Sequence, residues 1–147
     1  MGTLKIAFQG EYGAYSEMAA RAYFGQNVDV LPSPNFVALF SAVENGEASH
    51  GMVPIENSLM GSIHENYDNL LAHGLQIVGE LKLRIVHNLI VNPGVKVEDI
   101  RHIYSQAPAL AQCKNIIASL SEAEAVMAPD TAGAVKQLKA SGARDAA

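Results

Sequence analysis

The chain has 147 residues, of which 49% are hydrophobic, so it is long enough to bury a core of ordinary domain size. Its net charge of −5, with 10 scattered basic residues, argues against a nucleic-acid surface, which needs clustered Lys and Arg. The single cysteine, Cys113, excludes an internal disulfide and suits a reducing cytoplasm. No signal peptide is recognised, and no apolar stretch approaches the roughly 18 residues of a membrane helix. We therefore expect a soluble cytoplasmic protein without nucleic-acid or membrane partners.

Strand and helix signals alternate along the first half of the chain. Short apolar runs that end at Gly, Pro or a polar cluster predict three strands, at 4–9, 28–31 and 50–55. Ser16 is a suitable N-cap for a helix that Gly25 ends, and apolar spacing predicts a second helix over 36–43 and a third through 67–71. Such alternation favours right-handed crossovers and therefore an α/β fold with mainly parallel sheets.

The second half begins with a segment of a different kind. Residues 75–92 show no helix signal, and apolar residues alternate with charged ones from Leu81 to Ile85, which is the pattern of an extended strand. Because typical strands have only about 5–6 residues, we expect this segment to pass from a first lobe, 1–78, to a second, 79–147. A second α/β round is predicted there, with strands at 101–104 and 123–127 and helices at 109–120 and 131–139. The small residues after Gly142 resemble the start of another strand, so we expect the chain to be cut short there.

Polar side chains gather where the buried strands are expected to end. The stretch 53–62 runs from an apolar strand into Glu56, Asn57 and Ser58, and ends at a Gly-Ser pair. Three further polar turns precede or open helices, at 13–16, 105–112 and 129–133. In open α/β sheets, ligands bind beyond the carboxyl ends of the strands, and helix N-termini there suit carboxylates or phosphates. We therefore predict a site for a small anion that is held mainly by neutral donors.

Other common sites lack their signatures in this sequence. A phosphate-binding loop of the GxxxxGK type is absent, and the glycines at Gly10 and Gly13 are too close together for a dinucleotide fingerprint. No Cys/His spacing indicates a metal site, and no nucleophile elbow supports a Ser-His-Asp triad.

Structural roles compete with the functional ones. Ser16, Asp130 and Thr131 are also explained as helix caps, and residues 56–58 as an ordinary polar turn. Structural or surface roles are expected for three further residues, His73, His87 and Cys113.

Taken together, these motifs resemble one family over about residues 4–141. The matching blocks follow one another in the family's order: Ile6-Ala7-Phe8-Gln9-Gly10, Gly13-Ala14-Tyr15-Ser16, Val53-Pro54-Ile55-Glu56-Asn57-Ser58, Gly61-Ser62, Val78-Gly79-Glu80, His87-Asn88-Leu89, Tyr104-Ser105, Ala109-Leu110-Ala111-Gln112-Cys113 and Thr131-Ala132. The most specific signal is the Pro-Ile-Glu-Asn-Ser block with its Gly-Ser pair, followed by Ala-Leu-x-Gln-Cys. On these blocks the chain resembles the catalytic domain of prephenate dehydratase.

The resemblance implies both a fold and a reaction. The fold is that of the type II periplasmic binding proteins, with two α/β lobes and the substrate in the cleft between them. In the reaction, prephenate loses its ring carboxylate as CO2 and its ring hydroxyl as water, which gives phenylpyruvate for phenylalanine biosynthesis. Aromatisation drives the step, so no cofactor or metal is required. The enzyme holds two carboxylates and assists departure of the hydroxyl by donating a proton or a hydrogen bond.

The resemblance also assigns residues by position. Asn57, Ser105 and Gln112 match catalytic residues of the family. The implied substrate-binding positions are Ser16, Ser58, Gly61, Ser62, Thr131 and Ala132. Glu56 is expected to be structural, because a bare carboxylate facing a dianion would be repelled.

The chain departs from the family pattern in two places. The family usually reads Ser-His-Pro-Gln-Ala-Leu where this chain reads Ser105-Gln106-Ala107-Pro108-Ala109-Leu110, so the turn is expected to differ in shape. The family's Thr-Arg-Phe motif and its phenylalanine-binding ACT domain have no counterpart in the 147 residues, which predicts a poor or inactive catalyst.

Three functional hypotheses therefore remain open. The chain is an enzyme fragment, a two-lobe binding module for a small carboxylate, or a subunit that another chain completes. An unpaired sheet edge at the C-terminus would invite pairing with a second copy, so we also expect a homodimer.

Overall fold

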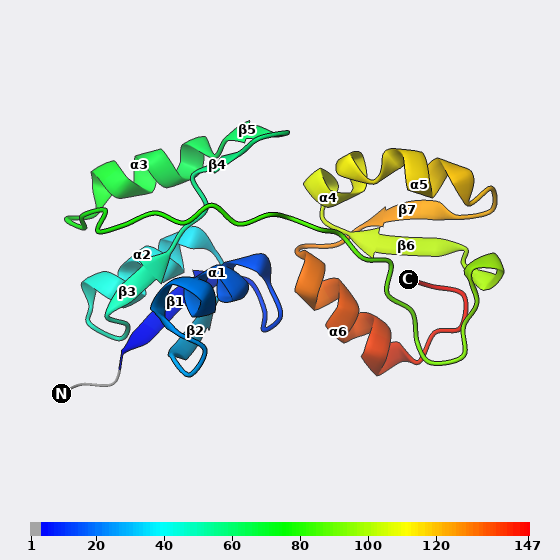
Figure 1. The fold of residues 1–147 in the computed structure, drawn as a ribbon, viewed down its shortest axis with the longest axis horizontal. Coiled ribbons are helices and arrows are strands. Elements are labelled where there is room, and N and C mark those ends of the chain that lie inside the picture. Colours follow the sequence, from blue (N-terminus) through cyan, green and yellow to red (C-terminus); the bar gives the residue numbers. More distant parts are fainter. Residues whose placement is uncertain (1–3) are drawn as a thin grey trace. The chain divides into compact units, whose positions relative to one another are not determined.

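The computed structural model describes residues 4–147, and the chain divides into two compact units. Unit 1 ends at Ile85, and unit 2 runs from Val86 to Ala147. Each unit combines parallel strands with helices in alternating order (Figure 1). The expected α/β class with mainly parallel sheets is therefore confirmed. The division between the units falls inside the segment 75–92.

Unit 1 is built on a parallel sheet in which the first strand is central. The strands are β1 (Lys5–Gln9), β2 (Asp29–Ser33) and β3 (His50–Met52), and their order is β2-β1-β3. Ile6 and Ala7 of β1 are both fully buried, and they point to opposite faces of the sheet. Burial on both faces explains why β1 reads as a continuous apolar run in the sequence.

Three helices surround this sheet, namely α1 (Tyr15–Phe24), α2 (Phe36–Glu44) and α3 (His64–Ala72). Ile6 packs in one cluster with Ala20 of α1, whereas Ala7 packs in another cluster with Leu39 and Phe40 of α2. Each face of β1 therefore has its own core.

Two boundaries in unit 1 differ from the sequence prediction. Ser16 is not the N-cap of α1, because the helix begins at Tyr15 after Ala14, and Ser16 lies in its first turn. Strand β2 continues through Pro32 to Ser33, where the sequence predicted an end. Proline is tolerated there because, among the strands of residues 4–147, β2 is hydrogen-bonded to β1 alone, which leaves its other side without a ladder to interrupt.

The third predicted strand is shorter than expected and is followed by a hairpin that the sequence did not reveal. β3 ends at Met52, and β4 (Glu56–Asn57) pairs antiparallel with β5 (Gly61–Ser62). We call residues 56–62 the 56–62 hairpin. It connects β3 to α3.

The long strand predicted over 75–92 is wrong. Residues 74–92 contain no helix or strand, and side chains such as Ile77 and Val78 are about 70% exposed (71% and 70%). A period-two pattern gives a strand only when the backbone finds a partner to pair with. Within residues 4–147 no strand pairs with this segment.

Unit 2 contains a short 3₁₀ turn, η1 (Val97–Asp99), and two parallel strands, β6 (His102–Ser105) and β7 (Glu124–Met127). Its helices are α4 (Ala107–Gln112), α5 (Lys114–Ser119) and α6 (Thr131–Ser141). The sequence predicted one helix where α4 and α5 lie. The break falls at Cys113, whose ψ of 6° departs from helical geometry and whose N–H is shared between two carbonyls, those of Ala109 and Leu110.

The last residues of the chain pair with β6. Ala146 forms a parallel bridge with His102, and the N–H of Tyr104 donates to the carbonyl of Ala147 at 2.8 Å. The N–H of Ala147 in turn donates to the carbonyl of His102 at 2.9 Å. Residues 145–147 thus pair with β6 in parallel.

Candidate functional site

The 56–62 hairpin brings together four of the predicted site residues. Glu56 pairs with Ser62, and Asn57 pairs with Gly61, whose φ of +83° suits glycine in the turn. Ser58, Gly61 and Ser62 are exposed, and Asn57 is half-buried. The hairpin therefore presents neutral hydroxyl and amide groups to solvent, as predicted for a site that holds a small anion.

Asn57 also organises the turn of this hairpin. Its Oδ1 accepts hydrogen bonds from the backbone N–H groups of Leu59 at 2.9 Å and Met60 at 3.2 Å. Such a side-chain turn leaves the Nδ2 group as the part of the amide that can donate to a ligand. Adjacent residues of a strand point to opposite faces, so Glu56 faces away from Asn57. Glu56 itself is exposed and shares its face with Ser62, its cross-strand partner.

Ser16 reaches the same edge of the unit 1 sheet through a different element. Helix α1 follows the carboxyl end of β1, and the 56–62 hairpin follows that of β3. β1 and β3 are parallel neighbours, with Phe8 opposite Met52, so both connections leave the same edge. Ligands of parallel α/β sheets bind at this edge.

Helix α3 holds the start of the hairpin through a hydrogen bond from Asn66. Asn66, which is fully buried, donates from Nδ2 to the carbonyl oxygen of Pro54 at 2.9 Å. The N–H of Ile63 donates to the carbonyl of Ile55 at 2.9 Å and closes the base of the hairpin. Asn66 was not predicted as a site residue, because nothing in the spacing of the sequence distinguishes it from a surface residue of a polar helix.

In unit 2, the predicted residues lie around the carboxyl ends of β6 and β7. Ser105 is the last residue of β6 and stands opposite Met127 of β7. Thr131 and Ala132 open α6, which follows β7. Because the two strands are parallel, Ser105 and Thr131 belong to the same edge of this sheet.

Asp130 is a helix cap, which was one of the two roles considered for it from the sequence. It is the N-cap of α6, and its Oδ1 accepts the N–H of Gly133 at 2.7 Å. Its carboxylate already uses part of the anion-binding capacity of that helix N-terminus. Thr131 therefore offers mainly its hydroxyl group.

Gln112 is paired with a histidine from the segment before η1. Its Oε1 lies 2.9 Å from Nε2 of His87. An amide oxygen only accepts, so Nε2 of His87 carries the proton in this arrangement and Gln112 keeps its amide N–H groups for other partners. His87 was expected to be structural, and it contacts Gln112, a candidate catalytic residue. The two residues are 25 positions apart, a separation at which the sequence gives no signal.

His73 is not the surface residue that the sequence predicted. Its ring stacks on Phe40 with centroids 5.4 Å apart, and its Nδ1 lies 2.8 Å from Oε2 of Glu44. This hydrogen bond from His73, with a second from the backbone of Gly74, holds the pKa of Glu44 below its ordinary value. The contact joins the C-terminal ends of α2 and α3.

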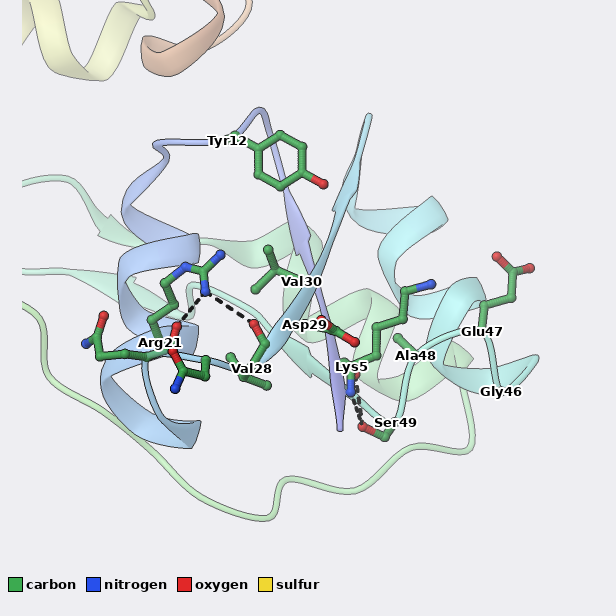
Figure 2. Close-up of a pocket in the computed structure, with 12 residues that line it drawn as sticks. Lys5, Tyr12, Arg21, Val28, Asp29, Val30, Gly46, Glu47, Ala48 and Ser49 are labelled. Carbon is green, nitrogen blue, oxygen red and sulfur yellow. Dashed lines mark hydrogen bonds between the residues drawn. The ribbon is translucent and has the colours of Figure 1, made fainter. Parts of the chain in front are cut away.

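A shallow pocket lies at the opposite end of the unit 1 sheet (Figure 2). Its lining includes Lys5 and Asp29, which begin β1 and β2, and Ser49, which precedes β3. Two of its polar side chains, Arg21 and Ser49, are engaged internally. Arg21 bonds Glu17 and two backbone carbonyls, and Ser49 Oγ bonds both backbone groups of Lys5. The predicted site residues lie elsewhere, so we assign no ligand to this pocket.

Among residues 4–147, no three His, Cys, Asp or Glu side chains are grouped so that they could hold a metal ion. None of the helices in the same range is long and apolar enough to cross a membrane.

Comparison with known proteins identifies relatives over nearly the whole chain. The family model described as prephenate dehydratase matches residues 6–147. Arogenate dehydratase/prephenate dehydratase 2, chloroplastic, of Arabidopsis thaliana is 46% identical over 144 residues, which are 98% of this chain and 37% of the relative. Arogenate dehydratase 2 of Petunia hybrida is 48% identical over 145 residues, 95% of this chain and 36% of that relative. The chain thus spans about a third of the length of these relatives.

Solved structures share the fold. One described as GqqA, a novel type of quorum quenching acylase, has a TM-score of 0.86 and 37% identity, and the match covers 97% of this chain and 51% of that one. Prephenate dehydratase of Arthrobacter aurescens, in complex with L-Phe, has a TM-score of 0.70 and 28% identity, with 92% and 45% covered. The predicted family and two-lobe, periplasmic-binding-protein-like fold are confirmed.

Proposed function

We propose, on the premise that this chain belongs to the prephenate dehydratase family, that it supplies substrate-binding and catalytic groups for the decarboxylating dehydration of prephenate or arogenate. The observation that supports the proposal is the 56–62 hairpin, which carries Asn57, Ser58 and Ser62 and follows the carboxyl end of a strand in a parallel sheet. The names of the relatives include both substrates, so the two acids are treated as equal candidates.

The chemistry requires neutral donors more than cations. As the bond from the ring to its carboxylate breaks, the electron pair enters the ring, and the hydroxyl leaves from the opposite carbon as water after accepting a proton. CO2, water and the aromatic acid are the products, so atoms and charge balance once one proton is supplied. A strong positive charge on the leaving carboxylate would hold it as an anion and oppose its loss, whereas hydroxyl and amide donors bind it more weakly.

Each unit contributes its own groups to this chemistry. In unit 1, the Nδ2 group of Asn57 and the hydroxyl of Ser58 donate to a carboxylate, with Gly61, the cross-strand partner of Asn57, allowing close approach of the backbone. The hydroxyl of Ser62, which pairs with Glu56 on the other face of the hairpin, is a further donor. In unit 2, Ser105 and the amide of Gln112 assist departure of the ring hydroxyl, and His87 fixes the orientation of Gln112. Ser16, Thr131 and Ala132 complete the set of substrate-binding positions.

Calorimetric titration tests the proposal. The chain is titrated with prephenate and with arogenate, and phenylpyruvate or phenylalanine release is followed separately in the natural protein that carries this sequence. We expect saturable binding of at least one acid, and Asn57→Ala should weaken it. Absence of binding of both acids would refute the proposal. The proposed homodimer and cytoplasmic location are tested by light scattering and by cell fractionation.

A second candidate function is supported by one specific comparison. The solved structure described as a quorum quenching acylase shares 37% identity with this chain at a TM-score of 0.86. An acylase needs an activated nucleophile. The Ser–His contact of Ser49 with His50, at 3.2 Å, is unsuited to this task because Ser49 Oγ donates to the carbonyl of Lys5. Hydrolysis of an acylated quorum-sensing signal, combined with failure to bind prephenate and arogenate, would favour the acylase.

A further inference from the structure

Asn66 combines complete burial with a single hydrogen bond. It is the one polar residue among the largest fully buried side chains of the described range, and its Nδ2 donates to the Pro54 carbonyl at 2.9 Å. Burying an amide is costly unless its polar atoms find partners. This bond therefore requires an explanation beyond packing.

The remaining polar atoms on this face of α3 are poorly satisfied. Asn66 Oδ1 and Nδ2 of Asn69 are buried, and neither has a hydrogen-bond partner within residues 4–147. The two residues are three positions apart and so share one face of the helix. An apolar side chain at either position would avoid these costs. At position 66, however, it would also remove the donor to Pro54.

Pro54 is the point at which the chain leaves β3 and turns toward the hairpin. Proline has no N–H, so its carbonyl is the only backbone group through which this residue can be held. Asn57, the candidate donor, follows three residues later. The Asn66 bond thus ties the chain before β4 to α3, and the Ile63–Ile55 bond joins the two arms at the base of the hairpin.

From this geometry we propose that Asn66 is a positioning residue for the 56–62 hairpin, which it holds in the orientation that presents Asn57 and Ser58 to the substrate. The proposal rests on the function proposed above. Asn66 does not touch the substrate, and it acts through the Pro54 carbonyl. Its role predicts a local effect when the donor is removed, whereas a purely structural role predicts a global one.

Hydrogen exchange of backbone amides, measured by NMR, separates these possibilities. In Asn66→Leu, exchange at the amides of Leu59, Met60 and Ile63 should accelerate about 10- to 100-fold, as expected for the loss of one buried hydrogen bond. Exchange in β1 should stay unchanged. Asn69→Leu is the control, because it removes a second buried amide from the same helix face without touching Pro54, and it should leave the hairpin amides unchanged.

Three results would overturn the proposal: unchanged hairpin exchange in Asn66→Leu, acceleration spread equally over β1, or the same local acceleration in Asn69→Leu. If Asn66→Leu fails to fold, Asn66→Ala removes the donor without adding bulk, and the same three criteria apply.

Calorimetry with prephenate and arogenate provides the functional readout. The dissociation constant should rise about tenfold in Asn66→Leu and stay unchanged in Asn69→Leu. An unchanged affinity in Asn66→Leu despite a loosened hairpin would overturn the positioning role. If the unsubstituted chain binds neither acid but the hairpin loosens as expected, the proposed function fails while the structural link between Asn66 and the hairpin stands.

Discussion

Asn57 carries two roles that one pair of substitutions can separate. Its Oδ1 accepts two backbone N–H groups at 2.9 and 3.2 Å, and its Nδ2 is the proposed donor to a substrate carboxylate. Asn57→Ala removes both functions. Asn57→Asp keeps the acceptor for the turn, removes the donor, and places a negative charge where a substrate carboxylate is proposed to bind.

The expected loss of stability in Asn57→Ala follows from the two hydrogen bonds that Oδ1 accepts. Each contributes about 0.5–1.5 kcal/mol, so Asn57→Ala should destabilise the turn by about 1–3 kcal/mol. Since a tenfold change corresponds to about 1.4 kcal/mol, exchange at the amides of Leu59 and Met60 should accelerate about 5- to 150-fold. In Asn57→Asp these amides should exchange as in the unsubstituted chain.

Substrate affinity shows whether Asn57 binds the substrate or only stabilises the turn. Prephenate or arogenate should bind at least about tenfold more weakly to both variants, because both lack the amide donor and the aspartate adds repulsion. If Asn57→Asp binds the acids as tightly as the unsubstituted chain, Asn57 is a turn residue and not a ligand. If Asn57→Ala leaves the exchange of both amides unchanged, the two hydrogen bonds do not stabilise the turn.

Two further predictions concern stability. Gly51→Ala should lower the free energy of unfolding by about 1–3 kcal/mol, because the added Cβ would lie 2.8 Å from the buried Leu39 side chain; urea denaturation measures this change. Gly74→Ala is the control, because nothing lies within 4 Å of the Cβ added there. Equal stabilities of the two variants would contradict the packing argument. His73 lowers the pKa of Glu44, so the stabilisation from this pair is fully present above the ordinary carboxyl pKa of about 4.3 and is lost as the pH falls through the lowered pKa. Glu44→Gln should therefore reduce the loss of stability in this acid range. If the stability of Glu44→Gln depends on pH as that of the unsubstituted chain does, the pair is not the source of the loss.

The sequence predicted those parts of the fold that local pattern determines. β1 was recognisable because burial on both faces requires the continuous apolar run from Ile6 to Phe8. Helix α2 was recognisable from its apolar spacing, with Asn35 and Asn45 at its ends. The order of strands and helices followed from these local signals.

Features that depend on distant partners were not predictable. The alternation within residues 75–92 suggested a strand, yet pairing requires a second backbone that the pattern does not specify. His73 was expected at the surface because its partner Glu44 lies 29 residues away. The same reason applies to Asn66, whose burial depends on how α3 packs behind the loop at Pro54.

The sequence indicated which residue types form the candidate site, but not the contacts that hold those residues in place. Asn57, Ser58, Gly61 and Ser62 are adjacent in sequence, and a short hairpin is enough to gather them. The contact of Gln112 with His87 joins residues 25 positions apart, so only the folded chain reveals it.

The pairing of residues 145–147 with β6 gives the two units a common topology. In unit 1 the order is β2-β1-β3, and in unit 2 the corresponding order is β7, β6 and residues 145–147, with the first strand central in both. The direction of winding therefore reverses on either side of that central strand. Such a reversal opens a crevice at the carboxyl end of the strand where it occurs. Gln9 and Ser105 occupy these equivalent places, so the two units share one strand arrangement without sequence similarity.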